Sequence, residues 1–347
     1  MSARPAQHST RMFAEAAESA AVVARQLSEN ANAIAALAAQ LRARPPRFIV
    51  TCARGSSDHA ATFAKYLFET HLGLVTASAS PSIASVYAVK PKLRDALFIA
   101  ISQSGRSPDL LRNTELARKA GTRVVVLVNQ EDSPLANLAD HLIPLHAGKE
   151  TSVAATKSYL CSLSALLQLT ATWCEDALLS QALRELPRAV GEAWTMDWSS
   201  LVNGLMDARD LFVVGRGLGL GAAQEAALKL KETCGLHAEA FSSAEVMHGP
   251  MAIVGKGFPV LAFAQDDDSG ESTLEVAKEF RARGARVWLA QPGAHGGDHL
   301  SLPASPHPAC TPLLTVCAFY RAANALSLAR GLDPDVPPYL NKVTETL

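Results

Sequence analysis

The sequence of 347 residues lacks several features that mark large classes of protein. Its longest apolar runs, such as VVVLV at 124–128, are far shorter than the roughly 18 residues of a membrane-spanning helix. The opening residues, MSARPAQHST, contain no apolar signal core. The net charge is −1, and no basic stripe with interleaved aromatic residues appears. We therefore expect a cytoplasmic protein that partners neither membrane nor nucleic acid.

Metal and disulfide signatures are also missing. The six cysteines form no CxxC pair and lie mostly within apolar segments, so they are typical of reduced packing thiols in a cytoplasmic protein. No cluster of candidate ligands for a metal or an organic cofactor is visible. The sequence therefore predicts neither a bound metal ion nor an organic cofactor.

What the chain does contain is a repeat. An Arg-Gly turn between an apolar strand and an alanine-rich helix occurs at 54–55 and again at 216–217, an offset of 162 residues. A glycine that ends a polar helix before a strand occurs at 121 and 284, an offset of 163. Two motifs with nearly the same offset indicate an internal duplication.

Short apolar strands alternate with helices in each half of the chain. In the first half we predict these elements, strand first, at 47–52, 58–71, 96–102, 108–120 and 123–128. This alternation is typical of a parallel sheet covered on both faces. The fold class is therefore α/β, with two tandem doubly wound, flavodoxin-like domains.

The length, about twice that of a common domain, agrees with two domains. We place their boundaries, with a helical segment before them and a tail after them, at 1–45, 46–185, 200–333 and 334–347. Further helices are expected at 11–43, 160–174, 188–208 and 313–330, with a proline-rich loop at 303–312.

The segment 224–250 carries the densest chemistry. Glu225, Lys229 and Glu232 are four and seven residues apart, so they share one side of a helix. Most of the other residues of this helix are small or apolar, which indicates burial and partners for the charges. An ordinary solvated helix would also show the Glu225–Lys229 pair. The glycine-rich turn before it and His248 after it favour a functional site.

Two hydroxyl-rich turns follow predicted strands, where ligands of doubly wound sheets bind. Helix N-termini, backbone N–H groups and hydroxyls suit a phosphate group, although a simple helix cap is the alternative for each turn. The absence of a Walker lysine disfavours nucleoside triphosphates. The candidate phosphate ligands are Ser102, Gln103, Ser104 and Ser107 in one turn, and Ser56 and Ser57 in the other.

These segments together resemble the sugar isomerase, or SIS, family. The resemblance rests on SQSG at 102–105, ETSVAATK at 150–157, EAALKLKE at 225–232, HAEA at 237–240 and HGP at 248–250. It covers nearly all of the chain beyond residue 45. The similar proteins are the isomerase half of glucosamine-6-phosphate synthase and stand-alone SIS-type glucosamine-6-phosphate deaminases.

The resemblance implies a role for each matching residue. The serine-rich turns would hold the phosphate of a sugar phosphate, and Glu232 would move a proton between C1 and C2. His248 would assist ring opening from the neighbouring subunit, which implies a homodimer with active sites at the subunit interface. Lys229, Glu225 and Lys342 would orient the open-chain sugar and the catalytic groups. Val153 and Ala155, with the neighbouring backbone, would line the sugar pocket.

The chemistry of these residues agrees with such a reaction. Aldose–ketose interconversion needs one base that takes a proton from C2 and returns it to C1, and a carboxylate can do this. An imidazole that titrates near neutrality can open the ring. The sequence departs from the family pattern at Arg106, where the synthase has an acid, at Ala155, which replaces a serine, and in a slightly shorter tail.

The sequence contains no recognisable glutaminase domain with an N-terminal cysteine, so we expect hydrolysis of an amino sugar rather than its synthesis. The leading hypothesis is conversion of glucosamine 6-phosphate to fructose 6-phosphate and ammonia. Alternatives are a plain phosphosugar isomerase, or a deaminase for another hexosamine phosphate such as galactosamine 6-phosphate. A non-catalytic sugar-phosphate sensor is the alternative of another class.

Overall fold

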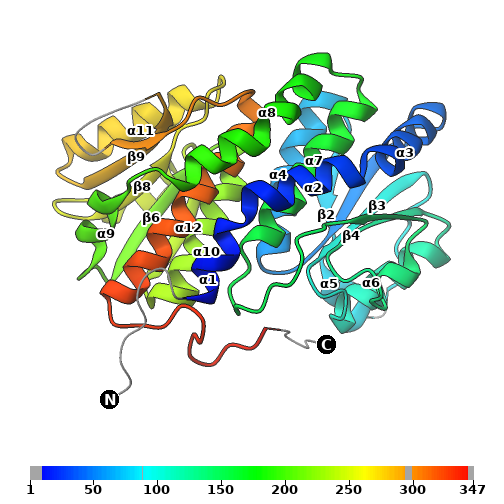
Figure 1. The fold of residues 1–347 in the computed structure, drawn as a ribbon, viewed down its shortest axis with the longest axis horizontal. Coiled ribbons are helices and arrows are strands. Elements are labelled where there is room, and N and C mark those ends of the chain that lie inside the picture. The colour runs from blue at the N-terminus through cyan, green and yellow to red at the C-terminus, as the bar shows by residue number, and fades with distance from the viewer. Residues whose placement is uncertain (1–9, 88, 294–298, 343–347) are drawn as a thin grey trace. The chain divides into compact units, whose positions relative to one another are not determined.

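The computed structural model describes residues 10–87, 89–293 and 299–342. Residues 1–9 of the predicted helical segment and 343–347 of the predicted tail lie outside the described residues. The chain forms two compact units, each built around one parallel sheet (Figure 1). This confirms the predicted class of two α/β sheet structures.

The first-sheet unit contains the residues of Ala21–Glu150, Ser158–Arg184 and Asn341–Leu347. Its five strands are parallel and lie in the order β2-β1-β3-β4-β5. Their bounds are β1 (Phe48–Cys52), β2 (Thr76–Ser78), β3 (Ala96–Ser102), β4 (Arg123–Val128) and β5 (His141–Pro144). Its helices include α3 (Ala31–Ala43), α4 (Ser56–Leu72), α5 (Pro81–Ser85), α6 (Pro108–Lys119) and α7 (Lys157–Trp173).

The second-sheet unit contains the residues of Met1–Ala20, Thr151–Lys157 and Glu185–Leu340. Its parallel sheet has the order β10-β9-β8-β6-β7, which repeats the topology of the first. The strands are β6 (Asp210–Gly215), β7 (His237–Ser242), β8 (Pro259–Phe263), β9 (Arg286–Pro292) and β10 (His299–Leu302). The helices include α1 (Arg11–Ala17), α9 (Ser199–Leu205), α10 (Gly219–Cys234), α11 (Gly270–Ala282) and α12 (Thr311–Ala329).

Continuous burial along the central strands shows that helices cover both faces of each sheet. In β6, Phe212 and Val214 pack with α11 residues such as Phe280 in one apolar core. Helix α10 contacts β6 and β7 and packs against α12, and the two helices lie side by side in Figure 1. In the first sheet, Val50 and Phe98 share a core with residues of α6. The strands are buried on both faces, as their continuous apolar character predicts.

The structure corrects several predicted elements. The sequence interpretation placed three strands in each half, and it missed β2, β5, β7 and β10, which are the edge strands of the two sheets. The predicted helix at 188–208 is wrong as one element, because α8 (Ala177–Trp194) ends before α9 begins. Asp197 Oδ1 accepts a hydrogen bond from the backbone N–H of Ser199, which starts the new helix. The region 11–43 is helical but divided into α1, α2 (Ser19–Glu29) and α3.

The proline-rich loop is shorter than predicted. Short 3-10 turns lie at Ala136–Leu138, Glu245–Met247, Pro250–Ile253 and Pro308–Cys310, and the last of these leads directly into α12 at Thr311. The helix ends at Ala329, close to Gly331, which has a φ of 79°. The glycine therefore ends the helix as the sequence predicts.

Candidate active site

The predicted phosphate-binding turn lies at the carboxyl end of β3. We call its residues Ser102, Gln103, Ser104 and Ser107 the serine cradle. Ser102 is buried, and its Oγ accepts a hydrogen bond of 2.9 Å from the backbone N–H of Gly105. Ser107 occupies the position before α6, yet its side chain makes no capping hydrogen bond. The helix-cap alternative therefore does not account for this hydroxyl.

Gly105 allows the cradle to turn sharply. Its φ of 64° lies in the left-handed region, which favours glycine. A Cβ at this position would lie 2.2 Å from Ser133 Oγ, and Ser133 is fully buried. The backbone O of Gly105 also accepts a hydrogen bond of 3.2 Å from the N–H of Leu135. The loop after β4 therefore packs against the turn at Gly105 and supports the serine cradle.

The second hydroxyl-rich turn lies beside the cradle. It follows β1, which pairs with β3 along its whole length. Ser56 and Ser57 stand half-buried in the first turn of α4. Arg54 makes two contacts of 2.7 Å with Oδ2 of Asp109, in the first turn of α6. This ion pair joins the two turns, as expected for the ends of neighbouring parallel strands.

Cys52, at the end of β1, does not provide a nucleophile for this site. Burial, reinforced by the charge of Asp109, raises the pKa of the Cys52 thiol to about 12. A thiol with such a pKa stays protonated at neutral pH and is a poor nucleophile. The hydroxyls, the amide and the backbone N–H groups of the two turns are suited to binding a ligand rather than attacking it.

The three charged residues of α10 form one cluster, as their spacing predicts. Lys229 Nζ lies 2.5 Å from Glu232 Oε2 and 3.5 Å from Glu225 Oε1. The side chains of Glu225 and Lys229 are 0% and 1% exposed, whereas that of Glu232 is 21% exposed. The solvated-helix alternative is therefore wrong for this pair. Glu232 is the member of the cluster that a ligand can reach.

A fourth residue, Tyr320 of α12, completes the cluster. Its hydroxyl donates a hydrogen bond of 2.9 Å to Glu225 Oε1. Burial by itself lowers the pKa of Lys229, but the charges of Glu225 and Glu232 outweigh burial and raise that pKa above its ordinary value. Lys229 therefore carries a firm positive charge between two carboxylates, a suitable neighbour for negative charge that develops on a substrate.

His248 is exposed, in the turn that follows β7 and the 3-10 turn Glu245–Met247. Its backbone N–H donates to the carbonyl of Glu245 at 2.9 Å. Within the described parts of the chain, no hydrogen bond or ion pair joins its ring to the α10 cluster. The structure thus leaves the imidazole accessible.

The segment 151–157 is held by the acidic residues of the N-terminal helices. The carboxylate of Glu15 accepts hydrogen bonds from the backbone N–H of Thr151 at 2.5 Å and of Ser152 at 3.1 Å. Lys157, almost fully buried, pairs with Glu18 at 2.6 Å. Between these anchors, Val153 and Ala155 are half-buried, so one face of each is available to a ligand.

Lys342 is anchored through Glu150, in the first-sheet unit. The two residues lie 3.1 Å apart, Lys342 Nζ to Glu150 Oε2. The side chain of Glu150 is fully buried and also accepts hydrogen bonds from the backbone N–H and the hydroxyl of Ser158, at the start of α7. The tail lysine is therefore fixed to the same carboxylate that holds the first turn of a helix.

Several of these positioning residues escaped the sequence interpretation. Tyr320 carries no local signal, since it lies 95 residues from Glu225. Asp109 and Ser133 resemble ordinary helix-start and loop residues. Glu150 could have been found, because it opens the ETSVAATK motif.

No helix of the described residues is long and apolar enough to cross a membrane. Nor do these residues contain a group of three or more His, Cys, Asp or Glu placed to hold a metal ion.

Solved structures of known proteins share this fold and much of the sequence. A protein from Silicibacter pomeroyi, proposed to be a phosphosugar isomerase, is 44% identical, with a TM-score of 0.89, over 94% of this chain and 100% of that one. The C-terminal domain of glucosamine-fructose-6-phosphate aminotransferase from Francisella tularensis is 25% identical, with a TM-score of 0.84, over 94% and 98% of the two chains.

A curated relative and a family profile give the same assignment. The relative is the glutamine–fructose-6-phosphate aminotransferase [isomerizing] of Symbiobacterium thermophilum, 35% identical over 324 residues. The match covers 88% of this chain and 52% of the relative, so the chain spans about half the length of the curated relatives it matches. The SIS domain profile matches residues 44–172 and 204–290. The chain therefore belongs to the SIS domain family.

Proposed function

We propose that this protein is a phosphosugar isomerase of the SIS family, which moves a proton between C1 and C2 of an open-chain sugar phosphate. The buried cluster of Glu225, Lys229 and Glu232 is the observation that carries the proposal. The buried Glu225 and Lys229 are costly to bury, even with the partly exposed Glu232 beside them, and perturbed groups of this kind concentrate at functional sites. The proposed substrate class also fits the serine cradle.

More specifically, we propose that the protein is a glucosamine-6-phosphate deaminase. Opening the ring breaks the C1–O5 bond while a proton passes from O1 to O5. A proton then moves from C2 to C1 and a second proton moves from the amine nitrogen to O1, which gives a hydroxyl at C1 and an imine at C2. Water adds to this carbon, and the C2–N bond breaks. The products are fructose 6-phosphate and ammonia, so the reaction consumes one water molecule and needs no oxidant or reductant.

Each residue has a proposed part in this sequence. Glu232 transfers the proton, because it is the only carboxylate of the α10 cluster with an exposed fraction that a substrate can use. Lys229 stabilises the negative charge of the enediol-type intermediate, and Glu225 fixes Lys229. His248, from the neighbouring subunit of a homodimer, exchanges the ring-opening proton. Lys342 orients the open-chain sugar.

The binding residues complete the proposal. The serine cradle, with Ser56 and Ser57, receives the phosphate through hydroxyls and backbone N–H groups, and Val153 and Ala155 line the sugar pocket. Support comes from the relatives, whose names join fructose 6-phosphate to an amino group. The proposed deaminase uses the same carbon skeleton, with water as the group that replaces nitrogen.

The test is an assay of purified protein with glucosamine 6-phosphate, in which ammonia and fructose 6-phosphate are measured together. Equal amounts of both are expected. Glu232→Gln should lower kcat by about a hundredfold or more, since it removes the general base. Glu271→Gln, at an exposed glutamate on α11 of the same unit that lies outside the family motifs, is the matched control and should retain full activity. Absence of ammonia would rule out the deaminase.

A plain isomerase is the second candidate, because the 44% identical protein is proposed to be a phosphosugar isomerase. The same assay separates the two, with galactosamine 6-phosphate and unaminated aldose phosphates added to the panel. Ketose formation from the unaminated sugars without ammonia from any hexosamine phosphate would identify an isomerase. Binding of these sugar phosphates without turnover of any of them would favour a non-catalytic sugar-phosphate sensor.

A further inference from the structure

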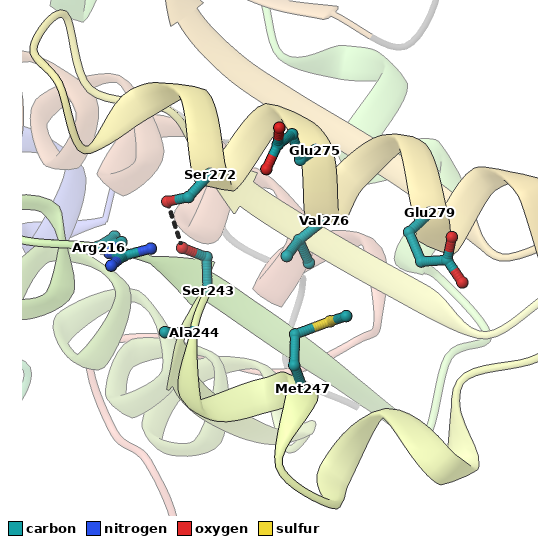
Figure 2. Close-up of a pocket in the computed structure, with 8 residues that line it drawn as sticks. All are labelled: Arg216, Ser243, Ala244, Met247, Ser272, Glu275, Val276 and Glu279. Atoms are coloured by element: carbon teal, nitrogen blue, oxygen red, sulfur yellow. Dashed lines mark hydrogen bonds between the residues drawn. The ribbon is translucent and has the colours of Figure 1, made fainter.

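A second polar pocket lies within the second-sheet unit, and none of its lining residues is among those assigned above. It has a volume of about 360 Å³ and lies where β6 and β7 end, beside α11 from Ser272 to Glu279. Figure 2 shows the hydroxyls of Ser243 and Ser272 facing each other in this pocket, with Arg216 on one side and Glu279 on the other. Its other polar lining residue is Glu275.

The pocket occupies the duplicated counterpart of the phosphate-binding edge. In a doubly wound sheet, ligands bind where the strand order reverses, at the carboxyl ends. That point lies between β1 and β3 in the first sheet and between β6 and β8 in the second. The repeat offsets of 162 and 163 place Arg216 opposite Arg54, and Ser272 opposite Asp109.

The presence of Ser272 in place of an acid changes the ion pairing of the arginine. In the first-sheet unit, Arg54 is neutralised by Asp109. In the second, a serine stands in place of that acid, and within the described ranges the guanidinium of Arg216 has no ion pair or hydrogen bond. The duplicated position thus offers an exposed positive charge at the edge of a pocket. A structural role for the arginine, such as the one Arg54 has, is absent here.

The lining specifies the ligand class. A guanidinium suits a phosphate monoester, which accepts charge-assisted hydrogen bonds. Two hydroxyls whose oxygens lie 3.0 Å apart stand beside it, and Ser272, which donates to the carbonyl of Ser269 at 2.9 Å, would turn its hydroxyl to the ligand. Glu279 is engaged by Arg283, whereas Glu275 has no ion pair among the residues that the structure describes. An exposed carboxylate disfavours a bare phosphate and favours a ligand that also carries a cation.

We propose that this pocket is a second, separate binding site for a small phosphate monoester that carries a protonated amine, with Arg216 holding the phosphate and Glu275 the ammonium. The loop after β8 differs from the serine cradle, since Gln265, Asp266 and Asp267 stand opposite Ser102, Gln103 and Ser104. The pocket is therefore a distinct site and not a copy of the first. The proposal does not depend on the reaction that the protein catalyses.

Calorimetric titration tests the site. The probe is 2-amino-2-deoxyglucitol 6-phosphate, which has no carbonyl group and cannot be isomerised. Arg216→Ala should weaken one class of sites at least about tenfold, which corresponds to about 1.4 kcal/mol of binding free energy. Arg209→Ala is the matched control, because Arg209 is an exposed arginine next to the opposite end of the same strand, β6. It should leave the isotherm unchanged.

A second probe, glucitol 6-phosphate, tests the amine preference. It should bind the Arg216-dependent site several-fold more weakly than the amino compound, and Glu275→Gln should remove this difference. Equal binding by the wild type and Arg216→Ala would overturn the proposal. A preference for the amine that survives Glu275→Gln would overturn the role of Glu275. Ser107→Ala affects only the cradle, so failure of the first site is distinguishable from failure of the second.

Discussion

At the scale of single residues, the α10 cluster depends on complete pairing. Removal of one partner from a buried ion pair leaves an uncompensated charge, which is strongly destabilising. Lys229 satisfies both glutamates, and Tyr320 supplies a further donor to the fully buried Glu225. Glu232 keeps a side-chain exposure of 21%, so the cluster leaves accessible the carboxylate that we propose as the proton carrier.

The hydroxyl of Tyr320 therefore has a measurable role. Tyr320→Phe removes the donor to Glu225 and should lower the free energy of unfolding by about 1.5–3 kcal/mol, the usual worth of a hydrogen bond to a charged group. Urea unfolding measures the change. Tyr66→Phe, on a half-buried residue of α4, is the control and should stay within about 0.5 kcal/mol of the wild type. Equal effects of the two substitutions would contradict this role.

At the scale of elements, two neighbouring strand ends become one binding edge through a few contacts. Arg54 and Asp109 join the turn after β1 to the first turn of α6. Ser133 fills the space behind Gly105, so the loop after β4 supports the turn after β3. Such support matters because a ligand-binding turn must hold its donors in place before the ligand arrives.

Gly105→Ala tests this support. The new Cβ would collide with Ser133, so the cradle must shift, and KM for the sugar phosphate should rise roughly tenfold to a hundredfold. Gly121→Ala, after the other end of α6, is the matched control. Gly121 also has a positive φ of 75°, but no atom lies within 4 Å of its added Cβ. Gly121→Ala should lower the free energy of unfolding by about 1–2 kcal/mol and should leave KM unchanged.

At the scale of the whole molecule, duplication supplied two similar sheets, and their loops then diverged. The first sheet carries the serine cradle, whereas the second carries the α10 cluster, the accessible His248 and Arg216, whose guanidinium has no ion pair among the residues that the structure describes. In the proposed function, phosphate binding and proton transfer therefore belong to different units of the chain. The proposed homodimer adds a further division, because His248 would serve the site of the partner.

Subunit mixing tests the dimer and the role of His248. The single variants Glu232→Gln and His248→Ala should each be nearly inactive. Random reassociation after co-refolding should restore roughly a quarter of wild-type activity, since half of the dimers gain one intact site of two. Two preparations of the same variant, treated identically, are the control. No recovery in a mixture that demonstrably contains mixed dimers would place His248 in the site of its own subunit.

The sequence predicted features that depend on neighbouring residues and missed features that depend on contacts between distant segments. The α10 cluster was predictable because helical periodicity is local, and three spaced residues suffice to define the face. The central strands were predictable from continuous apolar runs. The edge strands were missed, since β2 has only three residues and β7 mixes polar with apolar ones. Such strands are specified by pairing with a distant neighbour and not by their own composition.

The sequence by itself determined the family, the duplicated α/β class and the residue types at the candidate site, because these depend on short motifs and local periodicity. Only the tertiary structure decided which groups are joined. Tyr320 reaches Glu225 across 95 residues, Glu150 holds Lys342 across 192, and Arg54 pairs with Asp109 across 55. Contacts between distant segments arise from packing, and packing is a property of the folded chain as a whole.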